Sequence, residues 1–294
     1  MSEPFHGVLP ALITPFTEDG SAIDTQALAA NVERLIGAGV GGLVPGGSTG
    51  EFTTLTHAER RRLTEVTVAS TAGRVPVVAG TGALSTRETV ELSVHAEQAG
   101  AAAVMIVPPF YDALSWRELL AHYTAVADAI DIQIMYYNLP SATGVSLTAA
   151  QLRELPITCL KDTGGDATAA TELIQTDGPT LLNGSDTLTF AALAAGARAV
   201  VWGVASIVPE PCVELHRLLI DDIDLPAARD LWARLWPLCQ FLEGHSYPAA
   251  VKTACALVGD RTGPVRAPLL PLDEDATRDL AALVELATLA EAAR

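Results

Sequence analysis

The sequence predicts a (β/α)8 barrel with an additional helical region at its C-terminal end. Eight short β-rich runs alternate with eight amphipathic helical stretches, the pattern of a barrel of parallel strands. The runs are almost continuously apolar, as expected of strands that are covered on both faces. From about Leu225 the pattern is purely helical, so we expect a barrel over residues 1–224 and a helical region over 225–294. A doubly wound open sheet is the alternative, but no glycine-rich dinucleotide fingerprint follows the first strand.

The boundaries of each element follow from apolar periodicity and from turn residues. The expected strands are residues 8–13, 42–45, 75–80, 103–107, 133–137, 157–161, 180–183 and 199–202. The expected barrel helices are residues 25–38, 57–71, 86–99, 116–129, 148–154, 167–175, 187–195 and 209–220. The expected tail helices are residues 227–243, 248–258 and 274–293, with a proline-rich linker at 264–271.

Composition and charge exclude several classes of protein. The chain has 294 residues, 49 % of them hydrophobic, and a formal net charge of −17. A nucleic-acid backbone would repel such an acidic protein, so we expect no nucleic-acid partner. No run of about 18 uncharged apolar residues is present, and residues 1–10 lack the basic-then-apolar pattern of a signal peptide. We therefore expect no membrane association and a cytoplasmic protein.

The cysteines and histidines do not indicate a metal or a cofactor. None of the four cysteines has metal-type spacing and each lies in an apolar neighbourhood, so we expect four reduced core thiols. The six histidines are scattered and suggest neither a catalytic triad nor a metal site.

Lys161 is the strongest candidate for chemistry. Two of the 18 lysine and arginine residues are lysines, Lys161 and Lys252, so a primary amine is rare in this chain. Lys161 ends the apolar run 157–161, just before the glycine pair 164–165. An amine can lose its proton and attack a carbonyl to form a Schiff base, which a guanidinium cannot, and burial disfavours the ammonium form. The alternative is a strand-end lysine that extends to solvent.

A glycine-rich turn follows the expected strand 42–45. Its sequence, Gly-Gly-Ser-Thr-Gly-Glu at 46–51, offers backbone amides and two hydroxyl groups, so Gly47, Ser48 and Thr49 are candidates for holding a carboxylate. The turn is not a phosphate-binding loop, because the Gly-Lys-Ser/Thr ending is absent. The alternative is a turn that is glycine-rich for conformational reasons alone.

Two tyrosines and one aspartate follow other strands. Tyr111 follows the strand 103–107 and Tyr137 ends the strand 133–137, and a phenol beside an amine can carry protons. The alternative for each tyrosine is a packing role with a satisfied hydroxyl group. Asp186 could accept hydrogen bonds from substrate hydroxyl groups, or it could cap the next helix.

Together these motifs resemble the pyruvate-dependent class I aldolases, typified by dihydrodipicolinate synthase and N-acetylneuraminate lyase. The motifs are Gly-Ser-Thr-Gly-Glu at 47–51, Tyr-Asn-Leu-Pro at 137–140 and Leu-Lys-Asp-Thr at 160–163, and the resemblance covers nearly the whole chain. It implies that Lys161 forms the Schiff base with a 2-oxo acid such as pyruvate and that Tyr137 moves protons to and from the adduct. It also implies that Ser48 takes part in the proton relay and that Thr49 binds the carboxylate, each with its backbone amide.

The resemblance also implies how subunits share the site. Tyr111 matches a relay tyrosine that reaches across a subunit interface, and Val201 lies where a backbone carbonyl lines the pyruvate site. The family is commonly a homotetramer built as a pair of dimers, and its chemistry requires no metal or other cofactor.

Three departures from the family pattern bear on the substrate. Ala142 stands where the synthases have an arginine for the carboxylate of the aldehyde, and Arg198 is a candidate replacement. The sequence Asn-Gly-Ser-Asp at 183–186 resembles the sugar-acid lyases of the family, and Trp202 is expected to narrow the pocket.

The sequence therefore predicts a Schiff-base lyase or aldolase acting on pyruvate or on a hydroxylated 2-oxo acid of the 2-keto-3-deoxy sugar acid type. Dehydration of such an acid would use the same residues. The alternatives are condensation of pyruvate with aspartate semialdehyde and a non-catalytic barrel that binds a 2-oxo acid.

Overall fold

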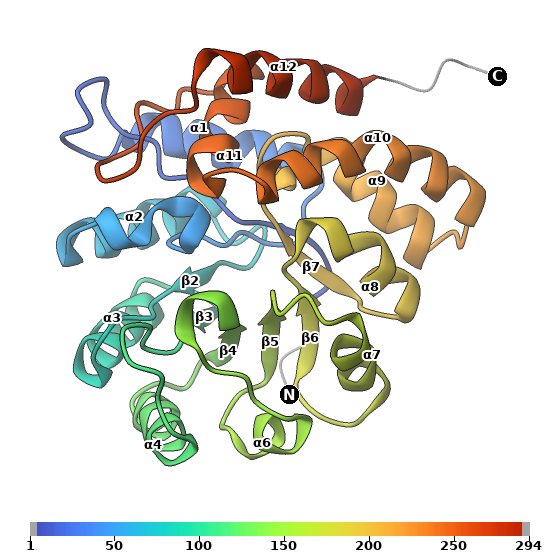
Figure 1. The fold of residues 1–294 in the computed structure, drawn as a ribbon. Helices are drawn as coiled ribbons and strands as arrows, with labels where there is room; N and C mark the ends of the chain where they lie inside the picture. Colours follow the sequence, from blue (N-terminus) through green and yellow to red (C-terminus); the bar gives the residue numbers. More distant parts are fainter. Residues whose placement is uncertain (1–4, 290–294) are drawn as a thin grey trace.

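The structure, a computed structural model, describes residues 5–289. Its centre is a parallel sheet of seven strands in the order β1-β7-β6-β5-β4-β3-β2, curled into a barrel (Figure 1). The strands are β1 (Gly7–Pro10), β2 (Val78–Gly80), β3 (Ala103–Ile106), β4 (Gln133–Asn138), β5 (Cys159–Asp162), β6 (Thr180–Asn183) and β7 (Ala199–Trp202). The predicted barrel architecture is confirmed, although several strands are shorter than expected.

The expected strand at residues 42–45 is replaced by two isolated bridges. Leu43 bridges Val77 and Val44 bridges Ala11, both in parallel, so this segment lies between β1 and β2 and closes the sheet. The backbone N–H of Val44 donates to the carbonyl of Pro10, and that of Leu43 to the carbonyl of Pro76. The prediction of a regular strand was wrong because the chain turns at residues 45 and 46, directly after the bridges.

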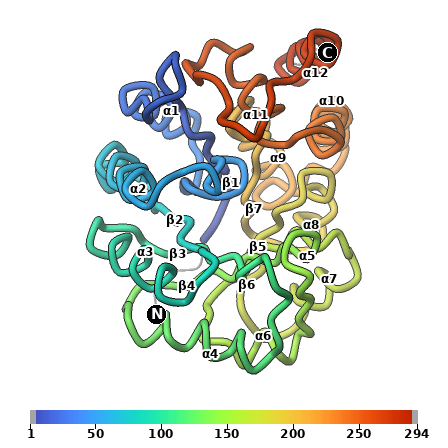
Figure 2. The backbone as a smooth tube through the Cα atoms, turned by 60° about the vertical axis from the view of Figure 1, so that its left-hand side comes forward, coloured from blue at the N-terminus to red at the C-terminus, as the bar shows by residue number. Residues whose placement is uncertain are grey.

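Helices surround the sheet, as the view in Figure 2 shows. The barrel helices are α1 (Thr25–Gly37), α2 (His57–Thr71), α3 (Thr86–Gln98), α4 (Trp116–Ala127), α5 (Pro140–Thr143), α6 (Ala149–Glu154), α7 (Ala167–Gln175), α8 (Thr189–Ala195) and α9 (Pro209–Ile220). Side-chain caps fix where several of them begin. Thr56 with Glu59 and Ser115 with Glu118 form capping boxes that satisfy the first free N–H groups of α2 and α4.

The strands alternate between an inner and an outer core. Met135 and Tyr137 of β4, with Val201 of β7, belong to a cluster inside the barrel. Their neighbours Tyr136 and Trp202 belong to clusters between the sheet and the helices. Successive side chains of a strand point to opposite faces of the sheet, so only every second residue of each strand can reach the inside of the barrel.

The C-terminal region contributes three helices, α10 (Leu225–Glu243), α11 (Tyr247–Leu257) and α12 (Glu274–Thr288) (Figure 1). Helix α10 packs against α9, and α12 packs against α10 and α11. The expected last helix ends earlier than predicted, and residues 290–293 of that prediction lie outside the described residues. Within residues 5–289, no helix is both long and apolar enough to span a membrane. The four cysteines are free and buried.

Candidate active site

Lys161 lies inside the barrel near the carboxyl end of β5. Its side chain is 5 % exposed and lines a cavity of about 310 Å3 at the carboxyl ends of the strands. A lysine that extended to solvent would be far more exposed, so that alternative is wrong. Gly184 makes room for the lysine, because a Cβ there would lie 2.6 Å from Lys161 Cε.

Tyr137 lies directly beside the amine. Tyr137 and Lys161 are Cα partners in the parallel pairing of β4 with β5, and Lys161 Nζ lies 4.2 Å from the centre of the tyrosine ring. Ser48, Thr49 and Val201 line the same cavity. The structure therefore brings together an amine, a phenol and two hydroxyl groups from three different segments of the chain.

A hydrogen-bond network fixes the ends of β4 and β5 against each other. Asn138 Nδ2 donates to Asp162 Oδ1 at 2.6 Å, and the Thr163 hydroxyl donates to the Asn138 carbonyl at 2.6 Å. The Gly164 amide also donates to Asp162 Oδ1, at 3.1 Å. Because these residues directly follow Tyr137 and Lys161, the network holds the phenol and the amine in register.

Asp186 lies across the cavity and is paired with a tyrosine from the C-terminal region. The Tyr247 hydroxyl lies 2.9 Å and 2.8 Å from the two carboxylate oxygens of Asp186, which is 1 % exposed. Burial raises the pKa of Asp186 to about 7, although the Tyr247 hydrogen bond and the charge of Lys161 act in the opposite direction. Asp186 makes no helix-capping hydrogen bond, so the capping alternative is wrong.

The second lysine, Lys252, forms a buried ion pair with Glu51, the last residue of the glycine-rich turn. Lys252 Nζ lies 2.5 Å from Glu51 Oε1, and both side chains are almost fully buried. The Arg266 amide donates to the other oxygen of Glu51 at 2.9 Å. Since Glu51 follows the short helix Ser48–Gly50, α11 holds the turn that carries Ser48 and Thr49.

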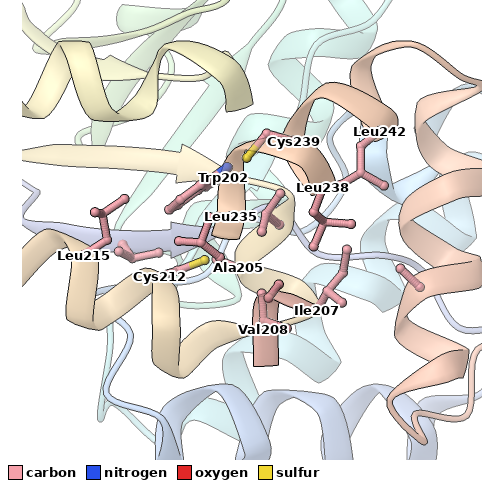
Figure 3. Packing of buried hydrophobic residues seen from close by; sticks show 14 of the residues in the cluster. Trp202, Ala205, Ile207, Val208, Cys212, Leu215, Leu235, Leu238, Cys239 and Leu242 are labelled. Atoms are coloured by element: carbon pink, nitrogen blue, oxygen red, sulfur yellow. The ribbon is translucent and has the colours of Figure 1, made fainter. Parts of the chain in front are cut away.

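Trp202 does not narrow the cavity. Its ring is 1 % exposed and packs outside the barrel with Cys212, Leu235 and Cys239 of α9 and α10 (Figure 3). The expectation was wrong because Trp202 follows the inward-facing Val201 and therefore points to the opposite face of β7.

Arg198 is also wrongly placed to replace the missing arginine. It directly precedes β7, at the opposite end of the strands from the cavity, and its carbonyl accepts a hydrogen bond from Gly7. Ala142 lies on α5, beside Ser141, which lines the cavity. Among the described residues that line this cavity, Lys161 is the single lysine or arginine.

Two predicted site residues lie outside this cavity. Gly47 lines a small adjoining space of about 10 Å3, which also touches Ser48 and Tyr137. Tyr111 is 88 % exposed and does not contact the cavity within a single chain. A role for Tyr111 in the site would therefore need a second subunit.

Several residues that line the cavity were not predicted from the sequence, among them two side chains of the C-terminal region. Tyr247 and Glu243 line the cavity from α11 and from the end of α10, and Gly203 lines it beside Val201. The tail was expected to be an addition to the barrel, and no motif marked either side chain. A larger groove of about 790 Å3 lies between α9, α10 and α12, away from Lys161.

Comparison with known proteins agrees with this geometry. The model of the Dihydrodipicolinate synthetase family matches residues 4–287. A 4-hydroxy-tetrahydrodipicolinate synthase of Methanopyrus kandleri is 42 % identical over 287 residues, covering 95 % of each chain. The crystal structure of a dihydrodipicolinate synthase superposes with a TM-score of 0.91 at 36 % identity, covering 96 % of this chain and 98 % of the other. YagE of Escherichia coli K12, a prophage protein of the same family solved in complex with pyruvate, gives a TM-score of 0.92 at 32 % identity, covering 98 % and 100 %.

Proposed function

This chain belongs to the dihydrodipicolinate synthetase family, and from that premise we propose that it cleaves a hydroxylated 2-oxo acid to pyruvate and an aldehyde. It is a Schiff-base carbon–carbon lyase of the class I aldolase type. The proposal concerns the substrate and the residues that act on it. The observation that carries it is the cavity lining, in which Lys161 is the one basic side chain among the described residues and Asp186 faces it.

In the proposed reaction, Lys161 Nζ attacks the ketone carbon of the substrate and water leaves to give an iminium. Tyr137 moves the protons of these steps, because its ring lies against the amine. Ser48 and Thr49, with their backbone amides, hold the carboxylate at the other side of the cavity.

Cleavage follows from the iminium. The hydroxyl group on C4 loses its proton to the Tyr137 relay and the C3–C4 bond breaks. The electron pair of that bond forms the C2–C3 double bond, while the π pair of the C2–N bond moves to the nitrogen, and the product is an enamine. An aldehyde leaves. The enamine is then protonated on C3, and water releases pyruvate and regenerates the free amine.

The far side of the cavity suits a hydroxylated partner rather than an anionic one. Asp186, Glu243 and the phenol of Tyr247 line it, and these groups offer hydrogen-bond acceptors and negative charge. A carboxylate buried there without a cation would cost several kcal/mol. Ala142 supplies no cation, and Arg198 lies at the other end of the barrel.

Condensation of pyruvate with aspartate semialdehyde is the second candidate, because the curated relatives at 36 to 42 % identity are named 4-hydroxy-tetrahydrodipicolinate synthase. The two candidates share the lysine imine and differ in the group held opposite it.

A parallel assay separates the two candidates. We expect pyruvate release from a panel of 2-keto-3-deoxy sugar acids, and weak or absent condensation of pyruvate with aspartate semialdehyde. The variant Ala142→Arg supplies the missing cation and should raise kcat/KM for aspartate semialdehyde by about tenfold or more. Efficient condensation by the unmodified protein, with no cleavage of the panel, would contradict the proposed substrate.

We propose further that the protein is a homotetramer built as a pair of dimers. The exposed position of Tyr111 supports this assembly, because its ring is 88 % exposed beside the mouth of a barrel whose cavity it does not reach. In the dimer, Tyr111 of a neighbouring subunit would complete the proton relay.

A further inference from the structure

Tyr247 enters the cavity from outside the barrel. It is the first residue of α11, and its hydroxyl group lies within 2.9 Å of both carboxylate oxygens of Asp186. Asp186 follows β6, so this contact joins the C-terminal helices to the sheet, opposite the glycine-rich turn that holds Ser48 and Thr49.

The backbone is shaped to accept this phenol. A Cβ on Gly203 would lie 2.0 Å from the Tyr247 oxygen and 2.9 Å from the ring carbon that bears it. No residue other than glycine fits there without displacing the phenol. Gly203 follows β7 and lines the same cavity, so the wall beside Val201 has no side chain where the tyrosine oxygen sits.

The hydrogen bond determines what the phenol can offer to a ligand. A tyrosine hydroxyl has one proton and can also accept. When Asp186 is ionised, Tyr247 directs its proton to the carboxylate, and its oxygen, beside the cavity-lining Gly203, is left as an acceptor. A hydroxyl group of the substrate can donate a hydrogen bond to this oxygen. A substrate with a hydrogen atom in place of that hydroxyl group leaves the oxygen without a partner, and an unpaired buried acceptor weakens binding strongly.

We propose that Tyr247 is a specificity-determining residue, whose oxygen, held by Asp186, accepts a hydrogen bond from a hydroxyl group on the portion of the substrate that leaves as the aldehyde. This inference rests on the proposed function. The preferred aldehydes are therefore hydroxylated ones, and their simple alkyl analogues react poorly.

The test measures a ratio of substrates rather than a single rate. Condensation of pyruvate with glyceraldehyde is compared with condensation of pyruvate with propanal, which has the same carbon chain without the hydroxyl groups. We expect Tyr247→Phe to lower the ratio of the two kcat/KM values by about 10- to 100-fold, with the propanal rate nearly unchanged. As a control, Tyr137→Phe should lower both rates by the same factor, because its phenol moves protons in steps that the two aldehydes share.

A second variant and a trapping assay distinguish a change in specificity from a misfolded protein. Gly203→Ala keeps both the phenol and the carboxylate but displaces the phenol, and it should lower the same ratio. Borohydride trapping of the pyruvate imine in each variant shows that the site is intact. A trapped imine with an unchanged ratio in both variants, or an equal fall in both rates, would overturn the inference alone. No imine in the unmodified protein would overturn the proposed function and the inference with it.

Discussion

Tyr137 and Lys161 occupy paired positions on neighbouring parallel strands, and the lysine nitrogen lies 4.2 Å from the centre of the tyrosine ring. The pairing of β4 with β5 therefore sets the distance between the phenol and the amine. A slip of one residue would present Tyr136, which now lies on the outer face of the sheet, in place of Tyr137.

Replacing Tyr137 by Phe should lower turnover by about 10²- to 10⁴-fold, the usual contribution of a positioned proton carrier. The imine should still form, but more slowly, because the lysine and its surroundings are unchanged. Steady-state kinetics and stopped-flow trapping measure the two effects. Tyr136→Phe is the matched control, since that hydroxyl is buried without a partner and its removal should leave turnover unchanged. Full activity of Tyr137→Phe would mean that the phenol serves only for packing.

Replacing Lys252 by Met should destabilise the protein by about 3–5 kcal/mol, because it leaves the buried Glu51 carboxylate without its charged partner. Chemical denaturation measures the change. Arg278→Ala is the matched control: it removes an ion pair with Asp275 in which both side chains are highly exposed, and it should cost about 1 kcal/mol or less. Equal losses in the two variants would contradict a structural role for the Glu51–Lys252 pair.

The free energy of unfolding should depend on pH through the carboxyl group of Asp186. Burial raises the pKa of its carboxyl group from 3.8 to about 7, so the folded protein binds this proton more tightly than the unfolded chain. The resulting stabilisation is complete below about pH 4 and is lost as the pH rises through about 7. Asp186→Asn removes this dependence, so its free energy of unfolding should rise relative to that of the unmodified protein between these pH values, by up to about 4 kcal/mol. Parallel curves for the two proteins would show that the carboxyl group titrates normally.

Mixing two inactive variants tests whether Tyr111 acts across a subunit interface. Lys161→Ala lacks the amine and Tyr111→Ala lacks the relay phenol. In a mixed dimer, one site combines an intact Lys161 with an intact Tyr111 from the neighbour. After subunit exchange, random pairing should restore about a quarter of the unmodified activity. No recovery, or an active monomer in sedimentation experiments, would contradict the shared site.

The local pattern of the sequence predicts most of the fold. The helices α2, α7 and α9 and the strands β6 and β7 have the expected bounds, because apolar periodicity and turn residues coincide at their ends. The four-residue helix α5 was missed, since a single turn after Pro140 has no periodicity to detect.

The sequence correctly placed Lys161 and Tyr137 together, because both stand at the ends of neighbouring strands, and their catalytic roles stay predictions. The prediction failed for Trp202, which was assigned to the pocket. Trp202 follows the inward-facing Val201 in β7, so its side chain points to the outer face of the sheet. The prediction also failed for Tyr247, whose role depends on a contact with Asp186, 61 residues earlier in the chain. No short-range pattern encodes such a contact.

The most direct test of the account is to trap the imine. The protein is incubated with pyruvate, reduced with borohydride and digested, and the peptides are weighed by mass spectrometry. We expect one modified peptide, the one that contains Lys161, because its amine lines the cavity beside Tyr137. Lys252 should remain unmodified, since it is buried against Glu51. An adduct on Lys252, or no adduct with pyruvate or any other 2-oxo acid, would contradict the Schiff-base mechanism.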